Sequence, residues 1–170
     1  MIEIRESNTT FETVYHAEYS PMDDEFKNAN CLILPYEHFR EGVDYCFSEY
    51  AHEVLQYAKD NPNGRIVMDI AATDETYKVI ELHAVLLQVG IFLATSVVLP
   101  LVVGLVTNYV YDKIKSLHQN EEDVNVRVTF ISELPDGTSK QLNYDGPADQ
   151  LSTITAELKK LADSGSSTEA

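Results

Sequence analysis

The pattern of apolar and polar positions is dominated by one apolar stretch from Ala84 to Tyr111, AVLLQVGIFLATSVVLPLVVGLVTNYVY, which contains no Asp, Glu, Lys, Arg or His. Because a helix rises about 1.5 Å per residue, this stretch reaches roughly 42 Å, more than the roughly 30 Å of bilayer hydrocarbon. The pattern therefore predicts a transmembrane helix. Pro100 is expected to kink this helix, and Lys113 and Lys115 resemble a basic membrane boundary.

The same stretch also fits a central helix buried inside a soluble α/β protein. Such a helix usually keeps one face charged and in contact with water. No charged face occurs between Ala84 and Tyr111, which favours the membrane interpretation over this alternative.

The positions before the apolar stretch predict a small α/β module over residues 1–80. Alternating or apolar segments rich in β-branched and aromatic residues predict four strands, at 2–5, 11–19, 31–34 and 65–71. Apolar residues at steps of three and four predict one helix over 43–59. The polar segment 21–30 is expected to be a loop, and Asp74 is expected to cap the long helix.

The positions after the apolar stretch predict a ββα module. Apolar and polar residues alternate over 124–130, which predicts a strand with one buried face. The turn chemistry of 135–138 predicts a hairpin, with a return strand over 140–144. Pro147 is expected to open a helix whose apolar stripe contains Leu151, Ile154, Leu158 and Leu161.

The predicted fold class is therefore α/β, with a small N-terminal α/β module, one long kinked transmembrane helix and a C-terminal ββα module. The corresponding boundaries are 1–80 for the first soluble module, 81–116 for the helix, 117–163 for the second soluble module and 164–170 for a disordered tail.

Composition limits the partners. The formal net charge of −16 makes nucleic acid an unfavourable partner. The N-terminal residues do not resemble a secretory leader, and Cys31 and Cys46 are expected to be reduced, buried thiols. Residues 84–111 are therefore expected to act as the uncleaved anchor of a single-pass inner-membrane protein. The cysteines and the missing leader favour a cytoplasmic N-terminal module, whereas the pair Lys113 and Lys115 favours a cytoplasmic C-terminal module, so the orientation stays open.

No catalytic or metal-binding motif is recognisable. The chain has no P-loop, GxGxxG, HExxH, CxxC or GxSxG pattern. The spacings of Cys31, His38, Cys46 and His52 match no structural zinc pattern. The sequence therefore predicts a non-enzymatic protein without a cofactor or a metal site.

Polar and small residues within the apolar stretch are the candidate functional positions. Amide and hydroxyl side chains in a membrane usually face other helices or water, and small residues let helices approach closely. The candidate pore-lining or helix-packing residues are Gln88, Gly90, Ala94, Thr95, Ser96, Pro100, Gly104, Thr107 and Asn108. Glu81 and Asp112 are the candidate acidic pore mouths, which favour cations.

A short chain with one membrane helix beside small soluble modules resembles the small membrane effectors of bacterial anti-phage defence systems. The resemblance covers architecture only. It implies a soluble part that perceives a nucleotide-type signal and a membrane part that opens or disrupts the bilayer. A lipid bilayer, a second copy of the chain, and a small nucleotide-type ligand or a regulatory protein are the partners expected.

These observations favour a homo-oligomeric membrane protein that acts as a gated pore or membrane-perturbing effector. Two alternatives remain: a membrane-anchored binding or scaffold module with a passive helix, and a soluble oligomeric α/β protein with a buried central helix.

Overall fold

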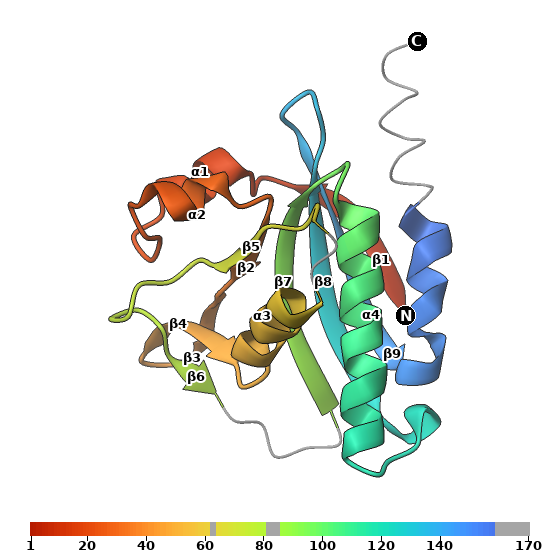
Figure 1. Cartoon of the computed structure of the whole chain (residues 1–170). Helices are drawn as coiled ribbons and strands as arrows, with labels where there is room; N and C mark the ends of the chain where they lie inside the picture. Colours follow the sequence, from red (N-terminus) through yellow and green to blue (C-terminus); the bar gives the residue numbers. More distant parts are fainter. Residues whose placement is uncertain (62–63, 81–85, 159–170) are drawn as a thin grey trace.

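The computed structural model describes residues 1–61, 64–80 and 86–158. Its larger sheet has six strands in the order β1-β9-β8-β7-β2-β5 (Figure 1). The bounds are β1 Ile2–Ser7, β2 Cys31–Leu34, β5 Met68–Ile70, β7 Leu86–Thr95, β8 Asn125–Glu133 and β9 Ser139–Pro147. Neighbouring strands are antiparallel except for the parallel pairs β7–β8 and β2–β5.

A smaller sheet has the order β3-β4-β6, with β3 Tyr36–Arg40, β4 Val43–Ser48 and β6 Val79–Ile80. The helices are α1 Phe11–Tyr15, α2 Asp24–Asn28, α3 Ala51–Asp60 and α4 Leu99–Ser116, with short 3-10 turns η1 Glu121–Asp123 and η2 Ala148–Thr153. Residues 154–158 continue from η2 as a helical turn.

The long apolar stretch is divided between a strand and a helix. Its first part forms β7, which pairs with β8 on one side and β2 on the other. The chain turns at Thr95–Val98, where the Val98 N–H donates to the Thr95 carbonyl at 3.1 Å. The second part forms α4, and Pro100 lies in its first turn, where a missing N–H costs nothing. Pro100 therefore begins a helix and does not kink one.

Among the described residues, no helix combines the length and the apolar character needed to cross a bilayer. The predicted fold class with a long transmembrane helix is therefore wrong, and so are the single-pass inner-membrane location and the ion-channel interpretation. The structure is a mixed α/β fold with two sheets and short helices, and its larger sheet has a hydrophobic core on each face. The alternative of an α/β protein with a buried central helix is closer to the structure, although the apolar stretch forms the buried strand β7 and the helix α4, which has one exposed face.

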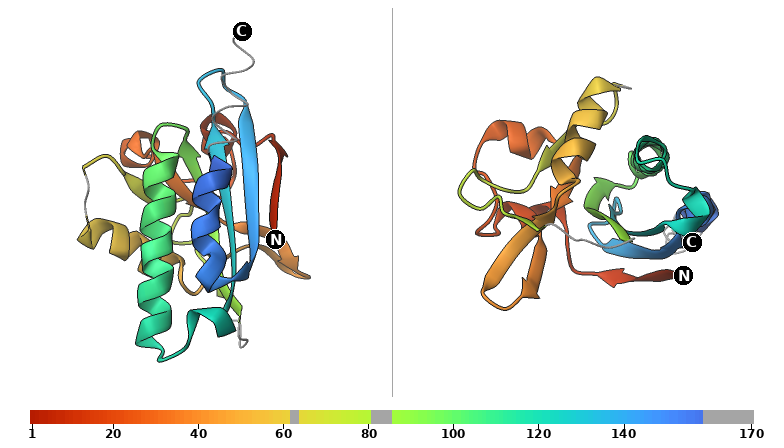
Figure 2. Two further views of the ribbon diagram at one scale, coloured as in Figure 1. Left: turned by 90° about the vertical axis from the view of Figure 1, so that its right-hand side faces the viewer. Right: turned by 90° about the horizontal axis from the view of Figure 1, so that it is seen from below.

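The larger sheet has side chains packed on both faces. One face contacts α3, α4 and η2, through a core that includes Phe92, Phe130 and Val106 (Figure 2). The opposite face contacts α1 and α2 near β2, through a second core that includes Phe26 and Leu93. Since the central strand β7 is covered on both faces, its sequence is apolar at nearly every position rather than alternating.

Local predictions before β7 were partly wrong. The strand predicted over 11–19 is a short helix, α1, capped by the Thr10 side chain. The helix predicted over 43–59 is two elements, since β4 precedes α3. Asp74 lies outside any long helix, because the chain continues into β6. The strands predicted at 2–5, 31–34 and 124–130 are confirmed as β1, β2 and β8.

Candidate functional site

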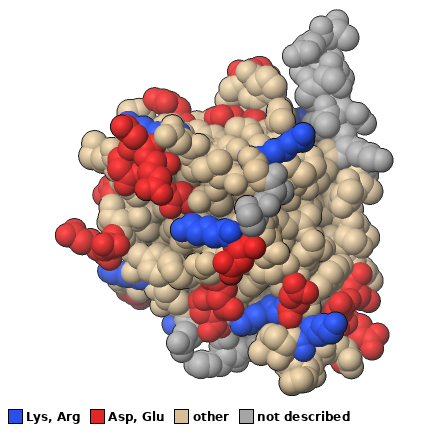
Figure 3. All heavy atoms as spheres, viewed as in Figure 1, with Lys and Arg blue, Asp and Glu red and all other residues tan. Residues whose placement is uncertain are grey.

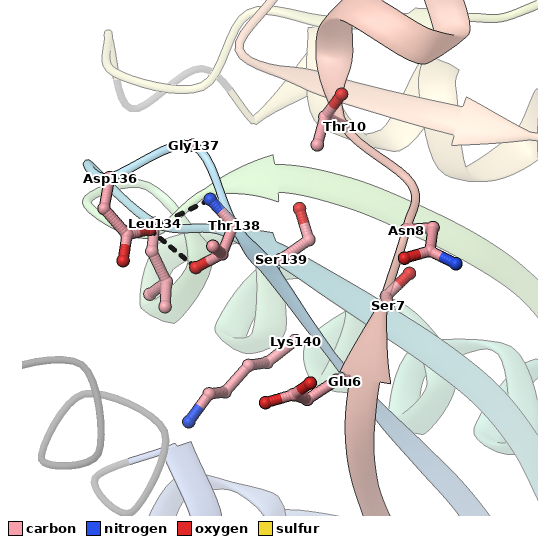
Figure 4. A pocket seen from close by; sticks show the side chains of 10 residues that line it. All are labelled: Glu6, Ser7, Asn8, Thr10, Leu134, Asp136, Gly137, Thr138, Ser139 and Lys140. Atoms are coloured by element: carbon pink, nitrogen blue, oxygen red, sulfur yellow. Dashed lines mark hydrogen bonds between the residues drawn. The ribbon is translucent and has the colours of Figure 1, made fainter. Parts of the chain in front are cut away.

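A polar groove of about 460 Å³ lies between the end of β1 and the hairpin that joins β8 to β9 (Figure 4). One wall comes from the end of β1 and the segment that follows it, and the other comes from the hairpin and the start of β9. The lining residues are Glu6, Ser7, Asn8, Thr10, Leu134, Asp136, Gly137, Thr138, Ser139 and Lys140. The side chains carry hydroxyl, amide, carboxylate and ammonium groups, and Leu134 is the apolar member.

The hairpin wall is held by its turn. The Leu134 N–H donates to the Thr138 carbonyl at 2.8 Å, and the Gly137 N–H donates to the Leu134 carbonyl at 2.9 Å. Gly137 has φ +86°, a left-handed conformation that favours glycine. This geometry sets Asp136 and Thr138 at the tip of the hairpin, beside the groove.

Asp136 is held as a carboxylate by its neighbour. Its Oδ1 accepts from the Thr138 hydroxyl at 2.6 Å and from the Thr138 N–H at 2.9 Å. These two hydrogen bonds lower the pKa of the Asp136 carboxyl, and the bond from the Thr138 hydroxyl has the larger effect. The positive charge of Lys140 also lowers this pKa. The groove therefore has a negative charge at this end near neutral pH.

The opposite wall is anchored by local capping. The Ser7 Oγ accepts from the Thr9 N–H at 3.1 Å, and the Thr10 Oγ1 accepts from the Thr13 N–H at 3.2 Å at the start of α1. The Glu133 carboxylate, at the end of β8, accepts from the Phe11 N–H at 3.1 Å. This last bond ties the two walls together across most of the sequence.

Ser139 lies at the floor of the groove, between the two walls (Figure 4). Ser139 is 3% exposed, and its Oγ has no hydrogen-bond partner in the described part of the chain. Buried hydroxyls are almost always hydrogen-bonded, because an unpaired one loses its water without compensation. The Ser139 hydroxyl therefore needs a donor or an acceptor that the described residues do not supply.

The charges around the groove are mixed. Glu6 lies directly opposite Lys140 in the β1–β9 ladder, so these two charges offset each other, and Asp136 leaves an acidic excess. Elsewhere acidic side chains gather over α1 and α2 (Figure 3). Together with the net charge of −16, this field disfavours an anionic ligand.

The candidate residues predicted on the apolar stretch separate into two groups. Those of β7 lie inside the sheet: Gln88, Gly90 and Ala94 are buried, and Thr95 ends the strand. Ser96 follows in the turn and is half-buried. The Gln88 side chain hydrogen-bonds the Tyr36 side chain. Burial raises the pKa of the Tyr36 phenol, and this hydrogen bond lowers it to a smaller extent.

The candidates of α4 lie on its outer side. Pro100, Gly104, Asn108 and Asp112 are exposed and four residues apart, whereas Thr107 is half-buried. Pro100, Gly104 and Asn108 come together beside α3, where they line a groove of about 310 Å³.

Polar residues near this second groove join α3 to α4. Asp112 accepts from the Tyr57 hydroxyl at 2.9 Å, and Lys113 forms an ion pair of 2.8 Å with Glu53.

The other predicted pore-mouth residue, Glu81, lies outside the described residues.

Sequence reasoning missed the groove residues, although it predicted the turn at 135–138. The turn signal was present, but nothing in the local pattern showed that residues 6–10 would lie against that hairpin. The β1–β9 pairing brings Ser7 opposite Ser139.

No three His, Cys, Asp or Glu side chains of the described residues come together as a set of metal ligands. Cys31 and Cys46 are buried free thiols, and burial raises the pKa of both. Comparison of the whole chain with protein-family models, with curated proteins and with solved structures gives no match. The resemblance to anti-phage membrane effectors therefore stays a prediction that no relative supports.

Proposed function

We propose that this α/β protein is a non-enzymatic binding module, and that the groove between β1 and the β8–β9 hairpin takes up a small hydroxyl- or amine-bearing molecule. The single observation that carries the proposal is the buried, unpartnered Ser139 hydroxyl at the floor of the groove. A ligand hydroxyl or amino group is the partner that this side chain lacks.

The lining supports this ligand class. Hydroxyls of Ser7, Thr10 and Thr138 both donate and accept, and the Asp136 carboxylate accepts only. A carboxylate that accepts from a ligand donor forms a stronger bond than a neutral acceptor does. The groove volume of about 460 Å³ accommodates a molecule of monosaccharide size.

The lining also supports binding rather than catalysis. Neither groove serine is hydrogen-bonded to a side-chain base in the described part of the chain, since the Ser7 Oγ accepts from the Thr9 N–H and the Ser139 Oγ has no partner there. Nucleophilic catalysis by serine needs an adjacent base within hydrogen-bond reach. The groove therefore offers recognition chemistry, and the proposed role is capture of the ligand.

The test is a titration of the full chain with glucose and with glucosamine, followed through backbone amide shifts in two-dimensional NMR. We expect shifts confined to residues 6–10 and 134–140. Binding of both sugars indicates recognition through hydroxyls, and binding of glucosamine alone indicates recognition of the amine by Asp136. Absence of shifts in these residues with either probe at millimolar concentration contradicts the proposal.

Ser139→Ala sharpens the test. Losing one hydrogen bond weakens binding by about fivefold, from roughly 1 kcal/mol per bond. The same change removes a buried unpaired hydroxyl, so the melting temperature should stay equal or rise. Ser116→Ala is the matched control, because the Ser116 hydroxyl donates to the Lys113 carbonyl at the far end of α4 and should leave binding unchanged.

A further inference from the structure

The outer edge of β1 is open for pairing. β1 lies at one end of the larger sheet, and in the described part of the chain only β9 pairs with it. Its register with β9 is unbroken from Ile2 to Ser7, so it has no bulge, and it contains no proline. Bulges and prolines are two of the devices that prevent a sheet edge from pairing with another chain, and charged side chains, which β1 carries at Glu3, Arg5 and Glu6, are a third.

The hydrogen bonds to β9 determine which backbone groups point outward. Met1 and Asp145 exchange both bonds, since the Met1 nitrogen donates to the Asp145 carbonyl and the Asp145 N–H donates to the Met1 carbonyl. Bonded and non-bonded pairs alternate along an antiparallel ladder. The odd-numbered residues therefore face β9, and Ile2, Ile4 and Glu6 direct their N–H and carbonyl groups to the open edge.

Charge selects one register for a second β1 strand. Antiparallel pairing through the outward groups requires even-numbered residues to lie opposite even-numbered ones. A register centred on Glu3 or on Arg5 places two like charges opposite each other, which is destabilising. The register centred on Ile4 instead places Glu3 of each strand opposite Arg5 of the other, and these pairs are attractive.

The side chains of β1 are available for such pairing. Glu3 and Arg5 are exposed, and neither has an ion-pair partner in the described part of the chain. Their neighbours on β9, Asn143 and Gln141, are uncharged amides. Ile4 is 38% exposed, and the same register places it against Ile4 of the second strand.

We propose that β1 pairs antiparallel with β1 of a second copy of this chain, in the register centred on Ile4. Ile4 pairs with the partner's Ile4, and Ile2 and Glu6 pair reciprocally with the partner's Glu6 and Ile2, each pair exchanging two backbone hydrogen bonds. The two six-stranded sheets become one continuous sheet across a two-fold axis. This inference does not depend on the ligand groove.

The first measurement is sedimentation velocity of the full chain. A single strand pair buries a small interface, so we expect a reversible dimer with a micromolar dissociation constant. A chain that is still monomeric at a concentration on the order of 100 µM overturns the proposal, because a dimer with a micromolar dissociation constant is largely formed at that concentration.

Charge substitutions test the register. Glu3→Arg and Arg5→Glu each place like charges opposite each other and should weaken the dimer by at least about tenfold. Mixing these two variants places Arg opposite Glu at every position, so a heterodimer should form although neither variant associates with itself. The double variant with both changes should again form a homodimer.

Two controls keep this test decisive. Glu121→Arg makes the same change of net charge as Glu3→Arg, at an exposed residue of η1 outside β1, and should leave the dimer intact. Ile4→Pro removes an outward N–H and leaves the β1–β9 hydrogen bonds in place. This variant should be folded by circular dichroism and monomeric by sedimentation velocity. A dimer that survives both single charge substitutions, or a mixture that fails to associate, contradicts the proposed register.

Discussion

The two halves of the apolar stretch have nearly the same composition and opposite structural roles. β7 is a central strand, covered on both faces by helices and the smaller sheet, and its residues are buried almost throughout. α4 is an outer helix, with a buried stripe that includes Val102, Val106 and Val110 and an exposed face of Pro100, Gly104 and Asn108. The comparison shows that β7 and this part of α4 lack charged residues for two different reasons.

In β7 the cause is burial on both faces, where a charge would be costly. In α4 the outward face is polar or small without being charged, until Asp112 at the far end. A sequence lacking charge is therefore compatible with water contact on one side of a helix. The three predictions that follow test this difference between the strand and the helix.

The largest effect is expected in β7. Phe92 is fully buried and stacks on Phe130 with ring centroids 5.7 Å apart. Phe92→Ala leaves a cavity between the sheet and α4 and should lower the free energy of unfolding by about 3–5 kcal/mol. Urea denaturation followed by circular dichroism measures it.

Val97→Ala is the control, because Val97 lies in the same apolar stretch but is 81% exposed. It should change the free energy of unfolding by less than about 0.5 kcal/mol. Equal losses at the two positions would contradict the assignment of burial along this stretch.

A smaller loss is expected at the bulge in β7. The pairing with β8 shifts register between Gln88 and Gly90, and Gly90 has φ +148°. A Cβ at this position makes only ordinary contacts with the Phe92 ring, at 3.6 Å, so the cost of Gly90→Ala is the backbone strain. We expect about 1–3 kcal/mol of destabilisation in the same denaturation experiment; no loss would mean that the strand accepts an alanine without strain.

The smallest effect has the opposite sign and falls on α4. Gly104 is exposed in the middle of the helix, and a Cβ there meets nothing within 4 Å. Gly104→Ala should therefore raise the free energy of unfolding by about 0.5–1 kcal/mol, through the higher helix propensity of alanine. Thermal melting measures this gain. A loss at this position would show instead that Gly104 packs closely against another helix, as the membrane interpretation expected.

Much of the local structure was predictable from short-range patterns. The alternation in Val126, Val128 and Phe130 predicted β8, because one face of that strand lies in the core that α3, α4 and η2 cover and the other face is largely polar. The strand at 31–34 was predictable because Pro35 ends it. The prediction of one helix over 43–59 was wrong because the apolar residues of β4 continue, by coincidence, the helical spacing of α3.

The candidate site was less predictable. The hairpin chemistry at 135–138 is local and was recognised, but the groove needs β1 beside β9, which pairs residues from the two ends of the described chain. The isolated Ser139 hydroxyl is likewise a property of the packed state, because any serine is hydrated in an extended chain.

By itself, the sequence determined the turns, several strands, an acidic surface and the apolar character of residues 84–111. Only the tertiary structure decided that this apolar segment is a strand between two cores, followed by a helix that covers one of them. The physical reason is that apolar side chains leave water equally well for a bilayer or for the two faces of a sheet. The choice depends on partners, here β2, β8 and the covering helices, that lie far away along the chain.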